Sequence, residues 1–556
     1  MIKNPKTVAE LIISCLEAEG VEYLFGIPGE ENIRLIDATA GSKVRFILVR
    51  DERAAAFMAD IYGRLTGKAG VCTATLGPGA INLMLGVVDA QADSSPLVAI
   101  SAQVGLNRIY KESHQIVDLV SMYRPVTKWA GTLLSPAATP EMVRKAFDVA
   151  QTERPGAVYL AIPEDLEAAL LTPDFKPLTA RPHHSAGPDP LQVAAAVDLI
   201  HKAKRPIILA GHGAARAGAE AALTRLSELL GVPVATTFMG KGVISDRHRN
   251  ALGVVGFMRH DYVNFAFDKS DLILAIGYEL QEFAPARINP NCDKMIVHVH
   301  RFAEDTDAAY PINVSIEADI VGSLGALIEA FTKAPLTPRP VNADIRGLID
   351  AELDAGANDN SYPLKPQRVV FDIRQAMGDE DIVLVDTGAL KMWMARLYPA
   401  FAPLTCLISN GLATMAFALP GALSAKLAKP RAKTLAVVGD GSYLMSSQEI
   451  ETAVREKIPL VVLIWVDQSY GLIKWKMDLE LGHHLDVDFG NPDFVKHAES
   501  FGAKGHQIKA AADLLPTLRT ALAEDGVSII ACPVDYSENI KLTDKLASLR
   551  DDKKRN

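Results

Sequence analysis

Apolar and polar positions alternate along the chain with two different periods. Residues 5–20 carry apolar side chains at the i, i+3 and i+4 spacing of one helix face, with Thr7 as the expected N-cap, and a short apolar run at 21–25 follows. The alternation then continues, and it predicts helices at 53–66 and 82–91 and strands at 46–49, 70–75 and 96–101. Strands that alternate with helices at this spacing are typical of βαβ units in a parallel sheet.

Two stretches interrupt this alternation. Residues 173–190 and 334–366 are rich in proline, alanine and polar side chains, as linkers are. The three blocks that they separate each repeat the strand–helix pattern. The fold class that follows is α/β, with three doubly wound parallel-sheet domains at residues 1–172, 190–334 and 366–545.

The composition excludes several classes of protein. The chain of 556 residues is 49% hydrophobic and 22% charged, which is the profile of a globular protein and not of a disordered or fibrous one. Its 57 basic and 67 acidic residues give a net charge of −10, which disfavours nucleic acid as a partner. The longest apolar run, 458–466, is far shorter than the roughly 20 residues that cross a bilayer, so no membrane association is expected.

The cysteines and the first residues indicate the compartment. Five cysteines lie far apart in the sequence without a CxxC pair, which is typical of buried thiols in a reducing environment. The first apolar segment is followed at once by Glu17 and Glu19, a pattern that a secretory signal does not have. We therefore expect a cytoplasmic protein.

The strongest chemical signal is the sequence Gly439-Asp440-Gly441-Ser442, which follows an apolar strand and precedes a predicted helix. Glycines on both sides of Asp440 let the backbone approach a phosphate closely, and a carboxylate is a hard oxygen ligand suited to Mg²⁺. By itself this tetrapeptide is equally typical of a plain strand–turn–helix connection.

A second apolar strand ends at Asp467. Because the carboxyl ends of parallel strands meet at the same edge of a sheet, the two aspartates are expected to lie close together. We predict that Asp440, Asp467 and the backbone carbonyl of Ser469 hold Mg²⁺ between the oxygens of a diphosphate. The second strand-end acid is what favours a metal site over a purely structural turn.

This pairing resembles the fingerprint of thiamine diphosphate enzymes, in which Gly-Asp-Gly is followed further along the chain by Asn-Asn; Asp467 and Gln468 stand at the second pair of positions. The resemblance covers nearly the whole chain and is closest to acetolactate synthases of the catabolic, flavin-free type. The segments that carry it are Gly26–Gly29, Asp51–Ala59, Gly77–Leu83, Glu112–Gln115, Met392–Arg396, Ile408–Met415, Glu499–Ala503 and Pro533–Asn539. The middle block shows Gly277-Tyr278-Glu279-Leu280 where the flavin-containing type has Arg-Phe-Asp-Asp, so FAD is not expected.

The resemblance implies roles for single residues at the cofactor. Glu52 matches the glutamate that hydrogen-bonds the aminopyrimidine ring, Met415 matches the bulky residue that bends the cofactor, and the carbonyl of Ala413 is implied to accept from the ring's amino group. The other implied cofactor-binding residues are Gly26, Pro28, Asn82, Thr387, Gly388, Gly439, Asp440, Gly441, Ser442, Tyr470 and Gly471. Taken alone, Glu52 is more typical of a first-turn helix acid and Met415 of an ordinary core residue; the other motifs are what favour the cofactor roles. Thr387 likewise fits a helix cap.

Three further residues are implied to act on the substrate. Gln103, His114 and Gln115 match positions that face the reacting carbonyl across the subunit interface in that family. His114 is then a candidate proton donor or oxyanion partner. It lies in a polar stretch, so a solvent-exposed surface histidine is the open alternative.

The resemblance implies an enzyme that depends on thiamine diphosphate and Mg²⁺. Its implied reaction is the decarboxylation of pyruvate, a small 2-keto acid, and addition of the two-carbon unit to a second pyruvate to give 2-acetolactate. The implied assembly is a homodimer at minimum and a homotetramer by expectation. The alternatives are a decarboxylase, a lyase or a carboligase with the same cofactor that uses another 2-keto acid or an aldehyde, and a non-catalytic protein that has kept the fold. A nicotinamide dehydrogenase is disfavoured because no GxGxxG follows a strand.

The chain departs from the family's pattern around the substrate. Asp51 and Arg53 flank the glutamate where most synthases have His and Gln, and Glu30-Glu31 stand where the catabolic type has a small residue and Lys. Two extra acids at the substrate mouth disfavour a second anionic keto acid unless Arg53 or Lys111 compensates for their charge.

Overall fold

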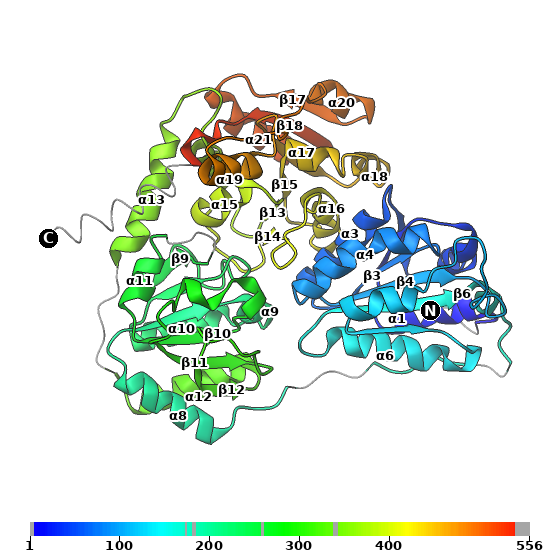
Figure 1. Ribbon diagram of the computed structural model, residues 1–556, viewed down its shortest axis with the longest axis horizontal. Helices are drawn as coiled ribbons and strands as arrows, with labels where there is room; N and C mark the ends of the chain where they lie inside the picture. The colour runs from blue at the N-terminus through cyan, green and yellow to red at the C-terminus, as the bar shows by residue number, and fades with distance from the viewer. Residues whose placement is uncertain (1–4, 173–174, 181–184, 257–260, 337–342, 540–556) are drawn as a thin grey trace. The chain divides into compact units, whose positions relative to one another are not determined.

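The computed structural model describes residues 5–172, 175–180, 185–256, 261–336 and 343–539 (Figure 1). These residues form three six-stranded sheets in which every pair of neighbouring strands is parallel. The predicted fold class, three doubly wound α/β domains, is therefore confirmed. No helix in the described ranges is long and apolar enough to cross a membrane.

The three sheets follow one another along the chain. The first has the order β2-β1-β3-β4-β6-β5, the second β12-β11-β10-β7-β8-β9 and the third β14-β13-β15-β16-β18-β17. Their strands are β1 (Tyr23–Gly26), β2 (Arg45–Leu48), β3 (Gly70–Ala74), β4 (Leu97–Gln103), β5 (Trp129–Thr132), β6 (Ala157–Pro163), β7 (Pro206–Ala210), β8 (Val234–Thr236), β9 (Ala251–Val254), β10 (Leu272–Ile276), β11 (Met295–His300), β12 (Ile312–Glu317), β13 (Ile382–Val385), β14 (Cys406–Ile408), β15 (Thr434–Gly439), β16 (Leu460–Val466), β17 (Lys504–Gln507) and β18 (Val527–Pro533).

The chain forms two compact units. The first contains the described residues up to 180 together with 411–431 and 446–459, and the second contains the other described residues. The first unit's α-helices are α1 (Val8–Ala18), α2 (Ile33–Ala38), α3 (Glu52–Thr66), α4 (Pro78–Ala92), α5 (Leu119–Tyr123), α6 (Thr139–Gln151), α7 (Glu164–Glu167), α16 (Ala418–Ala428) and α18 (Glu449–Arg455). The second unit's are α8 (Pro190–Lys202), α9 (His212–Arg216), α10 (Glu220–Leu230), α11 (Asn264–Lys269), α12 (Ile320–Lys333), α13 (Ala343–Ala357), α14 (Pro366–Ala376), α15 (Ala389–Leu397), α17 (Asp440–Leu444), α19 (Gly471–Leu481), α20 (Phe494–Ser500) and α21 (Leu514–Ala523).

Helices cover both faces of the first sheet (Figure 1). Apolar residues of α1 and α6 pack in one hydrophobic cluster with Val71, Val98 and Ile100, which point to the same face because side chains alternate along a strand. The helices α3 and α4 contact β3 and β4 and each other. The side chain of Thr7 accepts from the backbone N–H of Glu10, so the predicted N-cap of α1 is confirmed.

Helices α16 and α18 lie in the first unit, although their positions in the sequence are within the predicted third domain. The hydroxyl of Ser424 on α16 donates to the backbone carbonyl of Met58 on α3 over 2.6 Å. The backbone N–H of Arg50 donates to both carboxylate oxygens of Glu449 on α18, at 3.0 and 3.3 Å. Two short segments of the predicted third domain are thus built into the unit of the first sheet.

The second predicted linker, 334–366, is wrong in part because it contains helix α13. Ile345, Ile349 and Leu353 recur every four residues on this helix and are buried in a hydrophobic cluster of the second unit. This apolar stripe stabilises the helix in spite of the surrounding polar and alanine residues.

In each sheet the strand order reverses at one inner position, between β1 and β3, between β7 and β10, and between β13 and β15; the first and third sheets reverse again at the edge, where β6 and β18 lie inside β5 and β17. Open α/β sheets bind ligands outside the carboxyl ends of the strands at such a point. In the third sheet, the segments that begin there are Thr387-Gly388 after β13 and Gly439–Ser442 at the end of β15.

Candidate active site

The carboxylate of Asp440 is buried at the carboxyl end of β15 and is held by four donors. Its Oδ1 accepts from the backbone N–H of Gly441 at 2.9 Å. Its Oδ2 accepts from the N–H groups of Asp467 and Gln468, at 3.2 and 2.8 Å. The fourth donor is Nδ2 of Asn491, at 2.7 Å. These bonds fix the orientation of Asp440 and bring the second strand-end acid beside it, as the sequence predicts.

The charged form of Asp467 is disfavoured in this position. Its burial, and then the negative charge of Asp440, raise the pKa of Asp467 to about 7. The hydroxyl of Ser469 donates to its Oδ2 over 3.1 Å. A divalent cation between the two aspartates would relieve both the desolvation and the repulsion.

The glycines of this region make room for close contacts. A Cβ on Gly471, the first residue of α19, would lie 2.3 Å from Oδ2 of Asp467. A Cβ on Gly441 would lie 3.0 Å from the ring of Tyr470, which is therefore packed against the Gly-Asp-Gly turn. The structure thus gives a steric reason for both glycines, and their role in cofactor binding stays a prediction.

Asn491 is a residue of this site that the sequence analysis missed. Its Nδ2 donates to Asp440, whereas its Oδ1 is buried and has no hydrogen-bond partner among the described residues. The loop around it is held by backbone bonds between Tyr470 and Val487 and between Phe489 and Gln468, each 2.9 Å long. No local pattern marks Asn491, because these loop contacts are what bring it to Asp440.

The donor set fits a diphosphate and Mg²⁺. The buried hydroxyl of Thr387, which follows β13, has no hydrogen-bond partner among the described residues. No group of three or more His, Cys, Asp or Glu side chains suited to a metal ion occurs in the described ranges. Two carboxylates are nevertheless enough for Mg²⁺, which is commonly bound by one or two carboxylates together with phosphate oxygens and water. Asp440, Asp467 and the orphaned oxygens of Thr387 and Asn491 would hold such a group.

Glu52 opens helix α3 in the first unit. The side chain of Asp51 caps this helix by accepting from the N–H of Arg53 at 2.8 Å. Oε2 of Glu52 accepts from Nδ2 of Asn82 on α4 at 3.1 Å. A Cβ on Gly79 would lie 3.3 Å from its Oε1, so α4 approaches the carboxylate closely. The structure thus brings Glu52 together with Asn82, another predicted cofactor residue.

The other predicted cofactor residues of the first unit make no hydrogen bond to Glu52 that the structure shows among the described residues. Gly26 ends β1, and a Cβ there would lie 2.2 Å from the carbonyl of Thr73, so close strand packing by itself requires this glycine. Pro28 is exposed. Ala413 is exposed in a left-handed conformation with φ 55°, and Met415 is half-buried.

The predicted substrate residues lie on or beside one loop, residues 104–117. The amide of Gln103 is 3% exposed and closes this loop, because its Oε1 accepts from Val104 N–H at 2.9 Å and its Nε2 donates to the carbonyl of Val117 at 3.3 Å. His114 and Gln115 are exposed on the loop. A Cβ on Gly77, at the start of α4, would lie 2.8 Å from the carbonyl of Gln115, so the loop rests against that turn.

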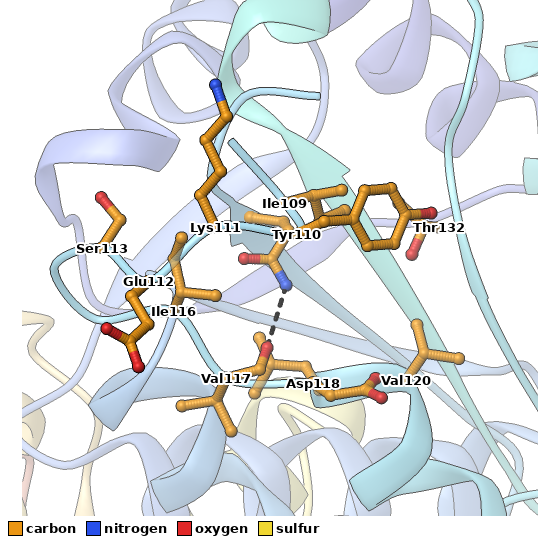
Figure 2. Close-up of a pocket in the computed structure, with 12 residues that line it drawn as sticks. Ile109, Tyr110, Lys111, Glu112, Ser113, Ile116, Val117, Asp118, Val120 and Thr132 are labelled. Carbon is orange, nitrogen blue, oxygen red and sulfur yellow. Dashed lines mark hydrogen bonds between the residues drawn. The ribbon is translucent and has the colours of Figure 1, made fainter. Parts of the chain in front are cut away.

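A pocket of about 570 Å³ lies beside the loop (Figure 2). Gln103 and Val117, which are joined by a hydrogen bond, both line it, and the ring of Tyr110 lies on the side of Thr132. The remaining lining residues are Ile109, Lys111, Glu112, Ser113, Ile116, Asp118, Leu119 and Val120. The loop that carries His114 and Gln115 therefore borders this pocket.

Three residues that depart from the family's pattern, Asp51, Arg53 and Glu31, each bind a neighbouring side chain. Asp51 and Arg53 form a bidentate ion pair, with Nη2 to Oδ2 at 2.6 Å and Nε to Oδ1 at 3.0 Å. The hydroxyl of Thr75 donates to Glu31. Arg53 therefore neutralises Asp51, and the charge of Glu31 is not compensated by Arg53.

Comparisons with known proteins agree with these motifs. The family descriptions "Thiamine pyrophosphate enzyme, N-terminal TPP binding domain", "central domain" and "C-terminal TPP binding domain" match residues 6–122, 193–327 and 386–532. The chain is 34% identical over 542 residues to the acetolactate synthase of Bacillus subtilis, covering 97% of this chain and 95% of the relative. It is 35% identical over 547 residues to a catabolic acetolactate synthase of Raoultella terrigena, covering 97% of each. A probable acetolactate synthase large subunit of Methanococcus aeolicus is 34% identical over 570 residues, covering 97% of this chain and 94% of the relative.

Proposed function

This chain belongs to the thiamine pyrophosphate enzyme family, and from that premise we propose that it is a thiamine diphosphate-dependent carboligase that forms 2-acetolactate from two molecules of pyruvate. The observation that carries this proposal is similarity over 97% of the chain to proteins named acetolactate synthase, including a catabolic one. The cofactor motifs at Glu52 and Asp440 are both present within that similarity.

The second unit would hold the diphosphate and Mg²⁺. Asp440, Asp467 and the backbone carbonyl of Ser469 are the proposed metal ligands, and the buried hydroxyl of Thr387 is a proposed donor to the diphosphate. The adjacent glycines and Ser442, at the start of α17, leave the backbone open to phosphate oxygens. The raised pKa of Asp467 supports a cation at this position.

The first unit would hold the pyrimidine half through Glu52. The bound cofactor would supply the electron sink that decarboxylation of a 2-keto acid requires. Glu52 is proposed to exchange a proton with the pyrimidine ring, while Asn82 keeps its carboxylate in position over 3.1 Å. Ala413 and Met415 are proposed to contact the same ring, and Gly26 and Pro28 to line the turn beside it.

The overall reaction consumes one proton. Two pyruvate anions and one proton give one acetolactate anion and CO₂, so a group at the acceptor carbonyl must deliver that proton. His114 is the proposed donor, and Gln115 is proposed to orient the carbonyl. Gln103 is proposed to hold the loop that carries both of them, in addition to the role at the carbonyl that the resemblance implies.

The assembly and the compartment are further parts of the proposal. We infer a homodimer at minimum and a homotetramer as the full assembly, in the cytoplasm. Ile81 and Leu85 are more than one third exposed on α4, on either side in sequence of Asn82, and a second subunit that covers them would remove this apolar surface from water.

A flavin-free central domain is also proposed. The carboxyl ends of β7 and β10 are occupied by buried charged side chains of the domain itself. Glu282 accepts from the N–H of His212 at 3.1 Å, and Glu279 accepts from Arg216 at 2.8 Å. We expect the purified protein to show no flavin absorbance; a stoichiometric flavin band would contradict this part.

One observation favours a second candidate, a carboligase with an uncharged aldehyde acceptor. Arg53 is bound to Asp51 and Glu31 accepts from Thr75, so Arg53 does not offset the charge of Glu31, and an uncharged acceptor is favoured unless Lys111 offsets it. The deciding experiment incubates the purified chain with pyruvate alone or with pyruvate and acetaldehyde, each with and without thiamine diphosphate and Mg²⁺. Cofactor-dependent acetolactate from pyruvate alone supports the proposed function. Acetoin from pyruvate and acetaldehyde, without acetolactate, supports the second candidate. Acetaldehyde as the product of pyruvate alone would contradict both and indicate a decarboxylase.

A further inference from the structure

The segment Gly411–Phe417 has a backbone that needs external support. Ala413 and Ala416 both adopt left-handed conformations, with φ 55° and 70°. A residue with a Cβ is sterically disfavoured there, so neighbouring groups must hold the segment in this form. Residues 411–413, at its start, are exposed, so the packing of the segment alone is not sufficient to hold this backbone conformation.

Asp89 on helix α4 and Asp93, the C-cap residue of this helix, supply that support. Oδ1 of Asp93 accepts from the N–H of Gly411 at 2.6 Å, and Oδ1 of Asp89 accepts from the hydroxyl of Thr414 at 2.8 Å. Residues four apart lie on the same side of a helix. The spacing of the two acceptors therefore matches that of the two donors, Gly411 and Thr414. A Cβ on Gly411 would lie 3.0 Å from Ala92, which means that the segment lies directly against the helix.

A buried arginine lies beside both acceptors and orients them. Nη2 of Arg64, on α3, lies 2.9 Å from Asp93 and 3.5 Å from Asp89, and it also binds Asp60 at 2.6 Å. The side chains of this cluster are at most 1% exposed. Three carboxylates, those of Asp60, Asp89 and Asp93, thus surround one guanidinium. Burial raises the pKa of Asp60.

The same arginine also contacts the far end of the segment. The guanidinium of Arg64 lies 5.3 Å from the ring centre of Phe417, and Phe57 packs edge-on against that ring with centroids 5.8 Å apart. Helix α3 begins with Glu52, and α4 carries the Asn82 that binds it. The cluster thus joins the two helices of the Glu52 site to the segment that carries Ala413 and Met415.

We propose that Asp89 and Asp93 are positioning residues that hold the 411–415 segment ready for the pyrimidine half of the cofactor. This inference rests on the proposed function, because it assigns Ala413 and Met415 to that ring. A segment fixed in advance loses no conformational entropy when the cofactor binds, so the bond between Thr414 and Asp89 contributes to cofactor affinity and not to pyruvate affinity.

The experiment titrates thiamine diphosphate, with saturating Mg²⁺, into the full-length chain stripped of cofactor, by calorimetry. Thr414→Val removes the hydroxyl and keeps the shape of the side chain. We expect about tenfold weaker cofactor binding, an unchanged KM for pyruvate at saturating cofactor, and restored binding in Thr414→Ser. If Thr414→Val does not fold, Thr414→Ala is measured in the same way.

Ser424→Ala is the matched control. Ser424 donates to Met58 over 2.6 Å between α16 and α3, and it does not belong to the 411–417 segment. We expect its Tm to fall while its cofactor affinity stays at the wild-type value. Wild-type affinity in Thr414→Val, or equal losses in Thr414→Val and Ser424→Ala, would overturn the proposal.

The test of this positioning role and the test of the proposed function can fail independently. A wild-type chain that binds the cofactor without forming acetolactate contradicts the proposed reaction, whereas the comparison of cofactor affinities still decides the role of Asp89. A wild-type chain that does not bind the cofactor contradicts both.

Discussion

Nδ2 of Asn82 donates to Oε2 of Glu52 over 3.1 Å and joins the start of α3 to α4. This bond holds one carboxylate oxygen, and the absence of a side chain at Gly79 leaves space beside the other. Glu52 is therefore oriented by its neighbours in the way that a group which exchanges protons requires.

The first prediction concerns Glu52 itself. Glu52→Ala should lower kcat by about 10²–10⁴-fold, because the proton exchange with the pyrimidine ring is lost, while cofactor binding largely persists. Acetolactate formation and calorimetric cofactor binding are the two measurements. The matched control is Glu141→Ala, which removes an exposed first-turn glutamate, on α6, and should cost only about 0.3–1 kcal/mol of stability. Full activity in Glu52→Ala would refute the role of this residue.

The second prediction tests the space beside Asp467. Gly471→Ala places a Cβ 2.3 Å from Oδ2 of Asp467 and should displace this carboxylate, so that Mg²⁺ and the cofactor bind at least about tenfold more weakly. Gly490→Ala is the control, because a Cβ at Gly490 meets nothing within 4 Å. Magnesium titrations of cofactor binding compare the two variants. Equal affinities would argue against Asp467 as a metal ligand.

The third prediction concerns Asn491, which orients Asp440 over 2.7 Å. Asn491→Ala should raise the Mg²⁺ concentration for half-maximal cofactor binding by about three- to tenfold, because a hydrogen bond to a charged acceptor is lost. Asp493→Asn, in the same loop, should leave this concentration unchanged, since Asp493 caps α20 and its amide replacement retains an acceptor. An unaltered Mg²⁺ dependence in Asn491→Ala would remove this residue from the site.

The fourth prediction concerns the ion pair of Asp51 and Arg53. Arg53→Gln leaves Asp51 uncompensated near Glu52, and one extra negative charge should raise KM for pyruvate by about three- to tenfold at low ionic strength. The difference should shrink with added salt, because salt screens partly exposed charges. Arg45→Gln, which breaks an exposed pair with Glu456 in the same unit, serves as the control. A salt-independent change in KM would point to a steric cause.

The fifth prediction is a pH dependence. Burial raises the pKa of Glu167 on α7 to about 8, and its Oε1 has no hydrogen-bond partner among the described residues. Because the folded-state pKa lies above the unfolded value of about 4.3, the folded chain retains a proton that the unfolded chain loses. The stability from this group is present below pH 4.3 and is lost as the pH rises towards 8, by at most about 5 kcal/mol.

Glu167→Gln has no carboxyl group that titrates. The stability of this variant should therefore depend less on pH between about 4.3 and 8 than that of the wild type. Urea midpoints at pH 5 and pH 8 are the measurement, and their difference should be smaller in Glu167→Gln than in the wild type. Glu164→Gln, an exposed glutamate on the same short helix, should keep the wild-type difference. An equal pH dependence in all three proteins would show that Glu167 titrates normally.

The sequence by itself determined the local elements and the strand-end chemistry. The periods of apolar residues predicted the parallel sheets, since side-chain direction repeats every two residues in a strand and about every 3.6 in a helix. The turn at Gly439–Ser442 and the acid at Asp467 could be placed together from the sequence, because each ends an apolar strand of the same predicted sheet. The sequence analysis missed helix α13 because it took the proline, alanine and polar composition of residues 334–366 as that of a linker. The apolar stripe of Ile345, Ile349 and Leu353 was the signal for the helix.

Only the tertiary structure decided which distant residues meet. Asn491 reaches Asp440 through a loop, and Asp89 and Asp93 bind a segment more than three hundred residues further along the chain. The grouping of 411–431 and 446–459 with the first sheet also follows from packing. Local periodicity records which face of an element is apolar, but it does not record which other element covers that face. That choice depends on shape and on the partners of buried charges, and these exist only once the chain is folded.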